Sequence, residues 1–316
     1  MILVVSHAAD DHAAGVLRAI ERRGQPATLV DTSAFPAAAS LTERFGGGEH
    51  AFELAFNGQR VDLRRCRAGW WRRPQPFTLH NGIAADVASW AYTECHEAVA
   101  GLWAALDLTW VNRPELDEVA HHKPFQLAVA TEVGLEIPRT LITNDPDEAR
   151  RFADELGAER VIYKTFLATE QHWRETRVLR AEELPLLDRV TLAPVIFQEF
   201  VPAEADIRVT VVGDNLFATA IVPAPGGYQL DYRMDLAGAS YLSTELPPEV
   251  ADRIRALMQR LGLLYGALDL RRRADGSYVF LEINPAGEWL FVEERSGQPI
   301  TEAVADFLVM LDRENE

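Results

Sequence analysis

The sequence predicts an α/β protein of more than one lobe, and three observations carry that prediction. The 316 residues are about twice the length of a common single domain. Residues 1–33 read as apolar strand, amphipathic helix and second strand with short connections, the order typical of a parallel α/β unit. The rest of the chain alternates helices with β-hairpins and contains no low-complexity linker, which is typical of further α+β lobes packed onto the first.

The first lobe is expected over residues 1–115. Its opening helix is expected to end at Gly24, because the apolar residues stop recurring at helical spacing there. Asn57-Gly58 separates two strand-like runs and predicts a hairpin. A stretch rich in alanine and tryptophan then predicts a long helix over residues 84–106.

Two further lobes are expected over residues 116–196 and 197–316. Asp145 followed by proline is typical of a helix start, since the carboxylate caps the first turn. Residues 213–214 and 275–276 are Gly-Asp and Asp-Gly pairs between strand-like runs, and each predicts a two-residue hairpin turn.

The composition excludes several classes of protein. A formal net charge of −17 repels nucleic acid, while a basic peptide is a compatible partner, although acidity also serves solubility. No apolar run approaches the roughly 20 residues of a membrane span, and the N-terminus lacks the basic start of a secretory signal, so a cytoplasmic protein without a membrane partner is expected. Cys66 and Cys95 form no CxxC pair and are expected to be buried thiols.

Lysine is scarce in this chain. It occurs only at Lys123 and Lys164, and the other 29 of the 31 basic residues are arginine. Arginine can replace lysine wherever a generic positive charge is enough, so these two positions are candidates for sites that need a compact ammonium group. The alternative is that two lysines survived by chance.

The last predicted hairpin carries candidate metal ligands. A two-residue turn at 275–276 would place Asp269 directly opposite Glu282, with Asn284 on the same face. Their neighbours are apolar, so the two carboxylates need a positive partner. Carboxylate and amide oxygens suit Mg²⁺, and the alternative partner is an arginine from residues 271–273. Neither GxxxxGK nor GxGxxG is present, so a bound triphosphate would be held by point charges and metal.

Six segments together carry a family resemblance: "HHKPFQLAVATEVGLEIPRT", "VIYKTF", "QEFV", "DIRVTVVGD", "GALDL" and "FLEINPAG". In this order they resemble the ATP-grasp superfamily of carboxylate ligases. "WWRRP", "WVNRP" and "TLITNDP" are similar to its microviridin-type (graspetide) branch, whose members macrocyclise ribosomal peptides through ω-ester or ω-amide bonds. The chain is also similar to RimK-like ligases, which add glutamate to a ribosomal protein.

The resemblance implies an ATP-grasp fold: an N-terminal parallel pre-ATP-grasp lobe, a central lobe with a lid, and a C-terminal lobe with the magnesium site. It also implies ATP and Mg²⁺ as cofactors. For the nucleotide, the resemblance implies phosphate binding by Lys123 and Lys164, an adenine hinge at Gln198, Glu199, Phe200 and Val201, and ribose binding by Glu204 or Asp206. For the reaction, it implies binding of the γ-phosphate or acyl phosphate by Arg208 and of the substrate carboxylate by Arg233 in "DYRMD". For the metal, it implies Mg²⁺ ligation by Asp269, Glu282 and Asn284. Arg72 is a further candidate to face the active site.

The activity implied is activation of Asp or Glu side chains of a precursor peptide as acyl phosphates, followed by attack of Ser/Thr hydroxyls or Lys amines. The catalytic candidates are Lys164, Arg208 and Arg233, and the implied partners are a leader-bearing peptide and a second copy of the chain. Two alternatives stay open: a RimK-like ligase that adds an amino acid, and a nucleotide-binding regulatory module without turnover. His121 and His122 point apart on a helix and are expected at the surface.

Overall fold

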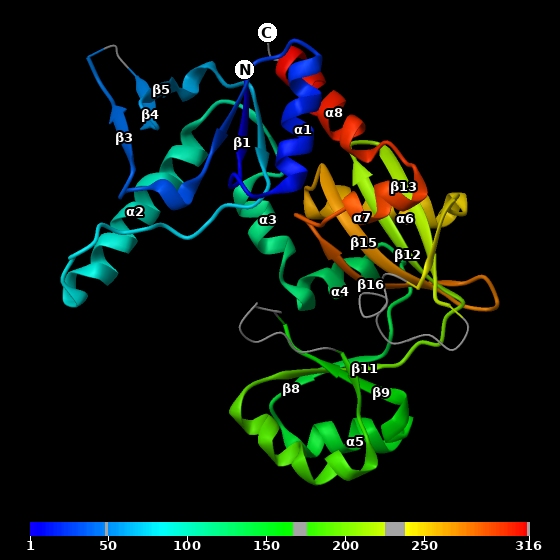
Figure 1. Ribbon diagram of the computed structural model, residues 1–316. Coiled ribbons are helices and arrows are strands. Elements are labelled where there is room, and N and C mark those ends of the chain that lie inside the picture. Colours follow the sequence, from blue (N-terminus) through cyan, green and yellow to red (C-terminus); the bar gives the residue numbers. More distant parts are fainter. Residues whose placement is uncertain (48–49, 167–175, 225–237, 315–316) are drawn as a thin grey trace.

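The computed structural model describes residues 1–47, 50–166, 176–224 and 238–314. Figure 1 shows three bodies: an N-terminal lobe, a central lobe and a C-terminal lobe. The described residues form four β-sheets within these bodies. The mixed α/β class predicted from the sequence is confirmed.

The N-terminal lobe is built on a parallel sheet in the order β2-β1-β6-β7. Alternate side chains of the central strand β1 are buried on both faces. One face packs on α1 and the C-terminal helix α8, and the other packs on α2 and a three-stranded antiparallel sheet. The elements are β1 (Ile2–Val5), α1 (Asp11–Arg22), β2 (Ala27–Val30), β3 (Ala39–Arg44), β4 (Ala51–Phe56), β5 (Gln59–Asp62), β6 (Ala68–Trp71), α2 (Ala85–Ala105), β7 (Thr109–Val111) and α8 (Ile300–Glu314).

The central lobe is an antiparallel sheet in the order β10-β9-β11-β8. One face packs against α5 and the 3₁₀ segment η5 through a core that includes Val161 and Phe197. In Figure 1 the sheet lies between α5 and the C-terminal lobe, so its other face is turned toward that lobe. The elements are β8 (Thr140–Thr143), α5 (Pro146–Leu156), β9 (Val161–Lys164), β10 (Arg177–Val178), η5 (Ala181–Leu192) and β11 (Val195–Glu199).

The C-terminal lobe is a five-stranded antiparallel sheet in the order β14-β13-β12-β15-β16. Aliphatic side chains on one face form a core with α4 and α6. Alternation of side chains along each strand therefore leaves the polar and charged residues on the opposite face. The elements are α3 (Pro114–Ala120), α4 (Lys123–Glu132), β12 (Ala205–Val212), β13 (Asn215–Val222), β14 (Ser240–Thr244), α6 (Pro248–Leu261), β15 (Tyr265–Arg272), β16 (Tyr278–Asn284) and α7 (Leu290–Ser296).

The β15–β16 hairpin corrects one prediction and confirms another. The two-residue turn at 275–276 is wrong, because Arg272 pairs with Tyr278 and the amide of Arg273 donates to the carbonyl of Ser277 at 2.9 Å. The register then shifts by one residue between Asp269 and Leu270, as in a β-bulge. The shift offsets the longer turn, so Asp269 still pairs with Glu282 and that expectation is confirmed.

Other expectations differ in detail. Residues 114–132 form two helices, α3 and α4, because Pro124 lacks an N–H and its ring would clash with the preceding turn of one continuous helix. The break places Lys123 in the first turn of α4. The expected lobe boundary at 196/197 falls inside β11, which pairs with β8 and β9 in the central sheet. Strands β3 and β14, helix α7 and segment η5 were not predicted from the sequence.

Both cysteines are free thiols, as expected. Cys66 is buried, and burial raises the pKa of its thiol to about 12. Cys95 is only half-buried, which corrects the expectation for that residue. Within the described ranges, no helix has the length and hydropathy needed to cross a membrane.

Candidate active site

A row of charged residues crosses the polar face of the C-terminal sheet. Arg208 on β12, Asp269 on β15 and Glu282 on β16 are neighbours on adjacent strands. The Arg208 guanidinium, which is 6% exposed, donates to the Asp269 carboxylate at 2.9 Å. Asn284 lies two residues beyond Glu282 on the same face and pairs with Ala267. Two carboxylates and an amide oxygen therefore share one face, and the buried guanidinium of Arg208 lies beside them.

Lys123 completes this row from a different element. Its ammonium group donates to Glu282, and both side chains are about one-fifth exposed. The partners come from the N-terminus of α4 and from β16, 159 residues apart in sequence. The structure thus brings one of the two scarce lysines into direct contact with a candidate metal ligand. The alternative to a metal was an arginine partner from residues 271–273. Asp269 does pair with an arginine, but that arginine is Arg208 on β12.

The second scarce lysine lies on the central sheet. Lys164 ends β9, and its ammonium donates to the side-chain oxygen of Gln198 at 3.1 Å. The amide of Gln198, which is 2% exposed, donates in turn to the Thr140 hydroxyl at 2.9 Å. Because the opposite face of this sheet forms the lobe's own core, the three side chains lie on the face turned toward the C-terminal lobe.

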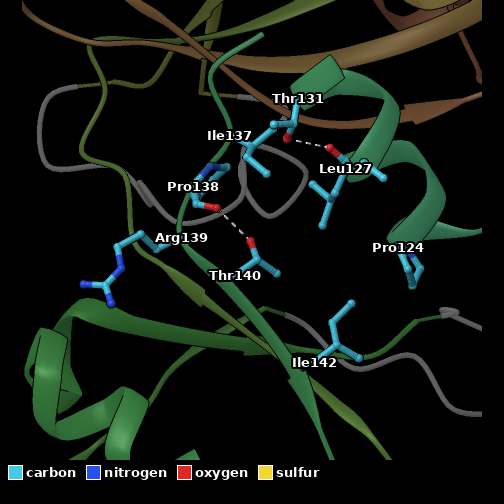
Figure 2. A pocket seen from close by; sticks show the side chains of 9 residues that line it. Pro124, Leu127, Thr131, Ile137, Pro138, Arg139, Thr140 and Ile142 are labelled. Atoms are coloured by element: carbon cyan, nitrogen blue, oxygen red, sulfur yellow. Dashed lines mark hydrogen bonds between the residues drawn. The ribbon is translucent and has the colours of Figure 1, made fainter. Parts of the chain in front are cut away.

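A groove of about 540 Å³ lies beside this chain of hydrogen bonds, between α4 and β8. Figure 2 shows the aliphatic side chains of Leu127, Ile137 and Ile142 around it, and Thr140 donating to the carbonyl of Pro138. None of the nine described residues that line the groove is acidic. The groove therefore offers apolar contact at the edge of the central sheet and no metal ligand.

The expected adenine hinge and ribose residues form the connection between the central and C-terminal sheets. The Glu199 amide donates to the carbonyl of Arg139 at 2.8 Å, and the Phe200 amide to the carbonyl of Arg160 at 2.8 Å. The Val201 carbonyl accepts from Arg271 at 2.6 Å, and Arg271 also donates to Asp206 at 3.0 Å.

The hydrogen bonds around Arg271 fix the end of the hinge to β12 and β15. Glu204 is exposed. Arg233 lies at 225–237, outside the described residues.

The loop after β16 is held by residues that the sequence reading largely missed. Asn112 donates to the carbonyl of Pro285 at 3.1 Å and bonds the backbone of Tyr265. Arg72 donates to the carbonyl of Gly287 at 3.0 Å. A side chain at Gly287 would come within 2.3 Å of the Ala267 Cβ, so the loop packs directly on the sheet. The only available signals were the motifs "WVNRP" and "WWRRP".

Comparison with known proteins agrees with this geometry. Residues 1–118 match the family described as the MvdD pre-ATP grasp domain. The macrocyclase MdnC from Microcystis aeruginosa MRC, solved with its precursor peptide MdnA, is 30% identical with a TM-score of 0.87, and the match covers 98% of this chain and 99% of that one. MdnB from the same organism is 31% identical with a TM-score of 0.83 and 98% coverage of both chains. The chain belongs to the ATP-grasp macrocyclase family.

Two more relatives bear on ligands and on the wider superfamily. The ATP-grasp ligase PsnB, solved with minimal precursor, Mg and ADP, is 28% identical with a TM-score of 0.78 and covers 98% of this chain and 97% of its own. Beta-citrylglutamate synthase B from Danio rerio is 25% identical over 64% of this chain. That match spans half the length of the synthase.

The oxygen donors of this ATP-grasp macrocyclase fit a hard divalent cation. Asp269, Glu282 and Asn284 present carboxylate and amide oxygens, the ligand types that Mg²⁺ prefers. Among the described residues no cluster of three His, Cys, Asp or Glu side chains has metal-site geometry. The candidate donor set is two carboxylates and one amide, which leaves room for phosphate oxygens or water as further ligands of Mg²⁺.

A buried ion pair anchors the N-terminal lobe of the macrocyclase to this loop. The guanidinium of Arg72, 1% exposed, donates to Asp10 at 3.2 Å. Burial alone would raise the pKa of Asp10, but the charge of Arg72 and the hydroxyl of Ser6 hold the pKa below its ordinary value. Both partners are thus charged and desolvated, so removal of one leaves the other buried without compensation.

Arg72→Met is therefore expected to lower the free energy of unfolding by about 3–5 kcal/mol, because it strands the Asp10 carboxylate. Arg73→Met is the matched control: its side chain is 39% exposed and pairs with half-exposed Glu288, so a loss of about 1 kcal/mol or less is expected. Urea unfolding followed by circular dichroism measures both. Equal losses in the two variants would contradict a structural role for the Arg72–Asp10 pair.

His12 makes the stability of the macrocyclase depend on pH. Burial and the charge of Arg72 lower the pKa of this histidine from 6.5 to about 4, and its ring packs on Trp289 with centroids 4.4 Å apart. The unfolded chain binds this proton near pH 6.5 but the folded chain binds it only near pH 4, so stability falls as pH decreases through this window. The expected loss over the whole window is on the order of 3 kcal/mol, of which about 2 kcal/mol falls between pH 6.5 and 4.5. A His12→Phe variant measured by urea unfolding at these two pH values is expected to lose less stability than the wild-type chain by about this amount.

Proposed function

We propose that the chain is an ATP-dependent ligase that activates Asp or Glu side chains of a ribosomal precursor peptide as acyl phosphates. It then joins them to Ser/Thr hydroxyls or Lys amines of the same peptide, which closes a ring. The observation that carries the proposal is the contact of Lys123 with Glu282 beside the Arg208–Asp269 pair. Such a site is suited to a metal-bound phosphate chain.

Phosphoryl transfer requires that the protein offset the negative charge of the phosphates and hold the reacting groups in position. The γ-phosphoryl group of ATP passes to the peptide carboxylate and ADP leaves; a hydroxyl or amine then displaces phosphate from the acyl carbon. Arg208 offsets charge on the transferring group, and Lys164 binds the phosphates from the central sheet. Gln198, bonded to Lys164 and Thr140, holds that ammonium in place. Mg²⁺ bound by Asp269, Glu282 and Asn284 would neutralise phosphate charge.

The proposed partner is a precursor peptide with a leader segment. MdnC was solved with precursor MdnA and PsnB with a minimal precursor, which supports a peptide substrate for this chain. The net charge of −17 is compatible with a peptide that carries basic residues. The expected homodimer and the role of Arg233 stay predictions; sedimentation of the purified chain tests the first and Arg233→Ala tests the second.

The likeness to beta-citrylglutamate synthase B favours one alternative, a ligase that adds an amino acid to its substrate. The two activities differ in the mass of the product. Ring closure removes one water for each bond, whereas addition of an amino acid increases the mass by one residue.

The deciding experiment incubates the chain with ATP, Mg²⁺ and a candidate precursor peptide, chosen as a short reading frame rich in Thr and acidic residues beside the chain's own gene. We expect ADP release and a peptide lighter by one water for each bond formed, measured by mass spectrometry. A gain of residue mass would favour the alternative. ADP release no greater than that of Glu282→Gln would favour a regulatory module without turnover.

A further inference from the structure

A cavity of about 1150 Å³ lies between the N-terminal lobe and α3, and Lys123 lies in its wall. It therefore adjoins the Lys123–Glu282 pair. A peptide side chain bound in the cavity would lie beside Lys123.

The walls of this cavity are of two kinds. Aromatic rings of Trp71, Phe77, Tyr92 and Trp103 line the side formed by the N-terminal lobe. Carboxylates of α3 line the other side, where they are contributed by Glu115, Asp117 and Glu118. Aromatic faces and carboxylates together favour a long aliphatic stem that ends in a cation.

Asp117 is the most buried of these three acids. It is 6% exposed, and its buried Oδ1 atom has no hydrogen-bond partner among the described residues. A buried carboxylate oxygen without a partner costs free energy that a bound donor would recover. Asp117 therefore places a desolvated negative charge in the wall of the cavity, where a bound cation would be favoured.

His121 is paired with this acid. Its Nδ1 atom lies 2.8 Å from the carbonyl of Asp117 and 3.3 Å from the Asp117 carboxylate. Both partners accept, so Nδ1 carries the proton and the lone pair of neutral imidazole is on Nε2. The side chain is 44% exposed and lines the cavity. The hydrogen bond to Asp117 outweighs burial and raises the pKa of His121, while Lys123 lowers it.

The remaining charges that face His121 are few. Glu118, three residues before it, and His122, directly after it, also line the cavity, as do Glu115 and His96. Glu115 is paired with Arg113, and His96 lies beside Glu97. The negative charge nearest to the imidazole is thus the carboxylate of its own partner.

We propose that this cavity receives a lysine side chain of the peptide as the acceptor, and that His121 takes up its proton. The proposal rests on the proposed function and names its acceptor class: an amine, hence an amide bond. The bound ammonium gives one proton to Nε2 of His121 and becomes a neutral amine. The amine nitrogen then bonds to the acyl carbon, the bond from that carbon to the phosphate oxygen breaks, and phosphate leaves with the electron pair and the second proton.

The test uses the candidate precursor peptide of the deciding experiment, synthesised with either Lys or Ser at its acceptor position. The wild-type chain is expected to close the Lys peptide at least 10-fold faster than the Ser peptide. Hydroxylamine traps the acyl phosphate as a hydroxamate, which separates activation from ring closure. His121→Asn is expected to raise the ratio of hydroxamate to ring product about 100-fold, the usual worth of a general base. His80→Asn, an exposed histidine outside the cavity, is the control and leaves the ratio unchanged.

A second variant separates chemistry from folding. Asp117→Asn removes the carboxylate that raises the pKa of His121, so the acid limb of the pH profile of ring closure is expected to move to lower pH. An equal fall of hydroxamate and ring product in His121→Asn, or an unmoved pH profile in Asp117→Asn, would overturn the role of His121. Faster closure of the Ser peptide would overturn the acceptor class. Absence of both ADP and hydroxamate with wild-type chain would overturn the proposed function itself.

Discussion

Lys164→Arg is expected to lower the rate of peptide-dependent ADP release about 100-fold, the typical cost of removing one charged group that stabilises a transition state. An ammonium is a compact point charge with three rotatable donors, whereas a guanidinium is a wider planar fork. The Lys164 ammonium donates to Gln198, and this hydrogen bond fixes the position of its charge. The longer and wider side chain of arginine would place its charge beyond that position. The composition agrees with a specific need for lysine at this position, because 29 of the 31 basic residues of the chain are arginine.

The control is Arg151→Lys on α5 of the same lobe. Arg151 is 66% exposed and pairs with Glu148 one helical turn away, so its replacement is expected to leave turnover unchanged. Full activity of Lys164→Arg in the same ADP assay would remove the argument from the scarcity of lysine.

Replacing the opposed acids is expected to abolish the magnesium dependence of ATP binding. Asp269→Asn with Glu282→Gln removes both carboxylates of the proposed ligand set, and affinity measured by calorimetry is expected to fall about 10- to 100-fold in Mg²⁺. In EDTA the variant and the wild-type chain are expected to bind ATP equally weakly.

Two controls accompany this pair. Glu282→Gln alone keeps the Arg208–Asp269 ion pair, so it tests the ligand without stranding a buried guanidinium. Asp275→Asn changes an exposed acid in the turn of the same hairpin and is expected to bind as the wild-type chain does. Unchanged affinity of the double variant in Mg²⁺ would discard the metal assignment.

Much of the fold follows from local patterns. The parallel N-terminal sheet was predicted because short connections between an apolar strand, a helix and a second strand leave few alternatives. The opposed acids were predicted from turn residues alone, and the prediction holds although its turn is wrong. A bulge beside Leu281 shifts the pairing of β15 with β16 back by one residue. No residue pattern in "SYVFLEINP" predicts a bulge.

The contacts that assemble the site could not be read from the sequence in the same way. Lys123 reaches Glu282 through packing of α4 on the C-terminal sheet, and Arg208 reaches Asp269 through pairing of β12 with β15. Arg72 reaches the loop after β16 across two lobes. Helix α8 returns to the N-terminal sheet, where Asp312 accepts from the amino group of Met1 at 2.8 Å. Pairings of this kind depend on tertiary packing, which spacing and propensity do not encode.

The most direct test of the account is a crystal structure of the chain with ADP and Mg²⁺. We expect the ammonium groups of Lys123 and Lys164 within hydrogen-bond distance of the diphosphate oxygens, and Glu282 turned from Lys123 toward the metal with Asp269 and Asn284. A nucleotide bound elsewhere, with Lys123 still paired to Glu282, would contradict the claim that these groups form one phosphate and metal site.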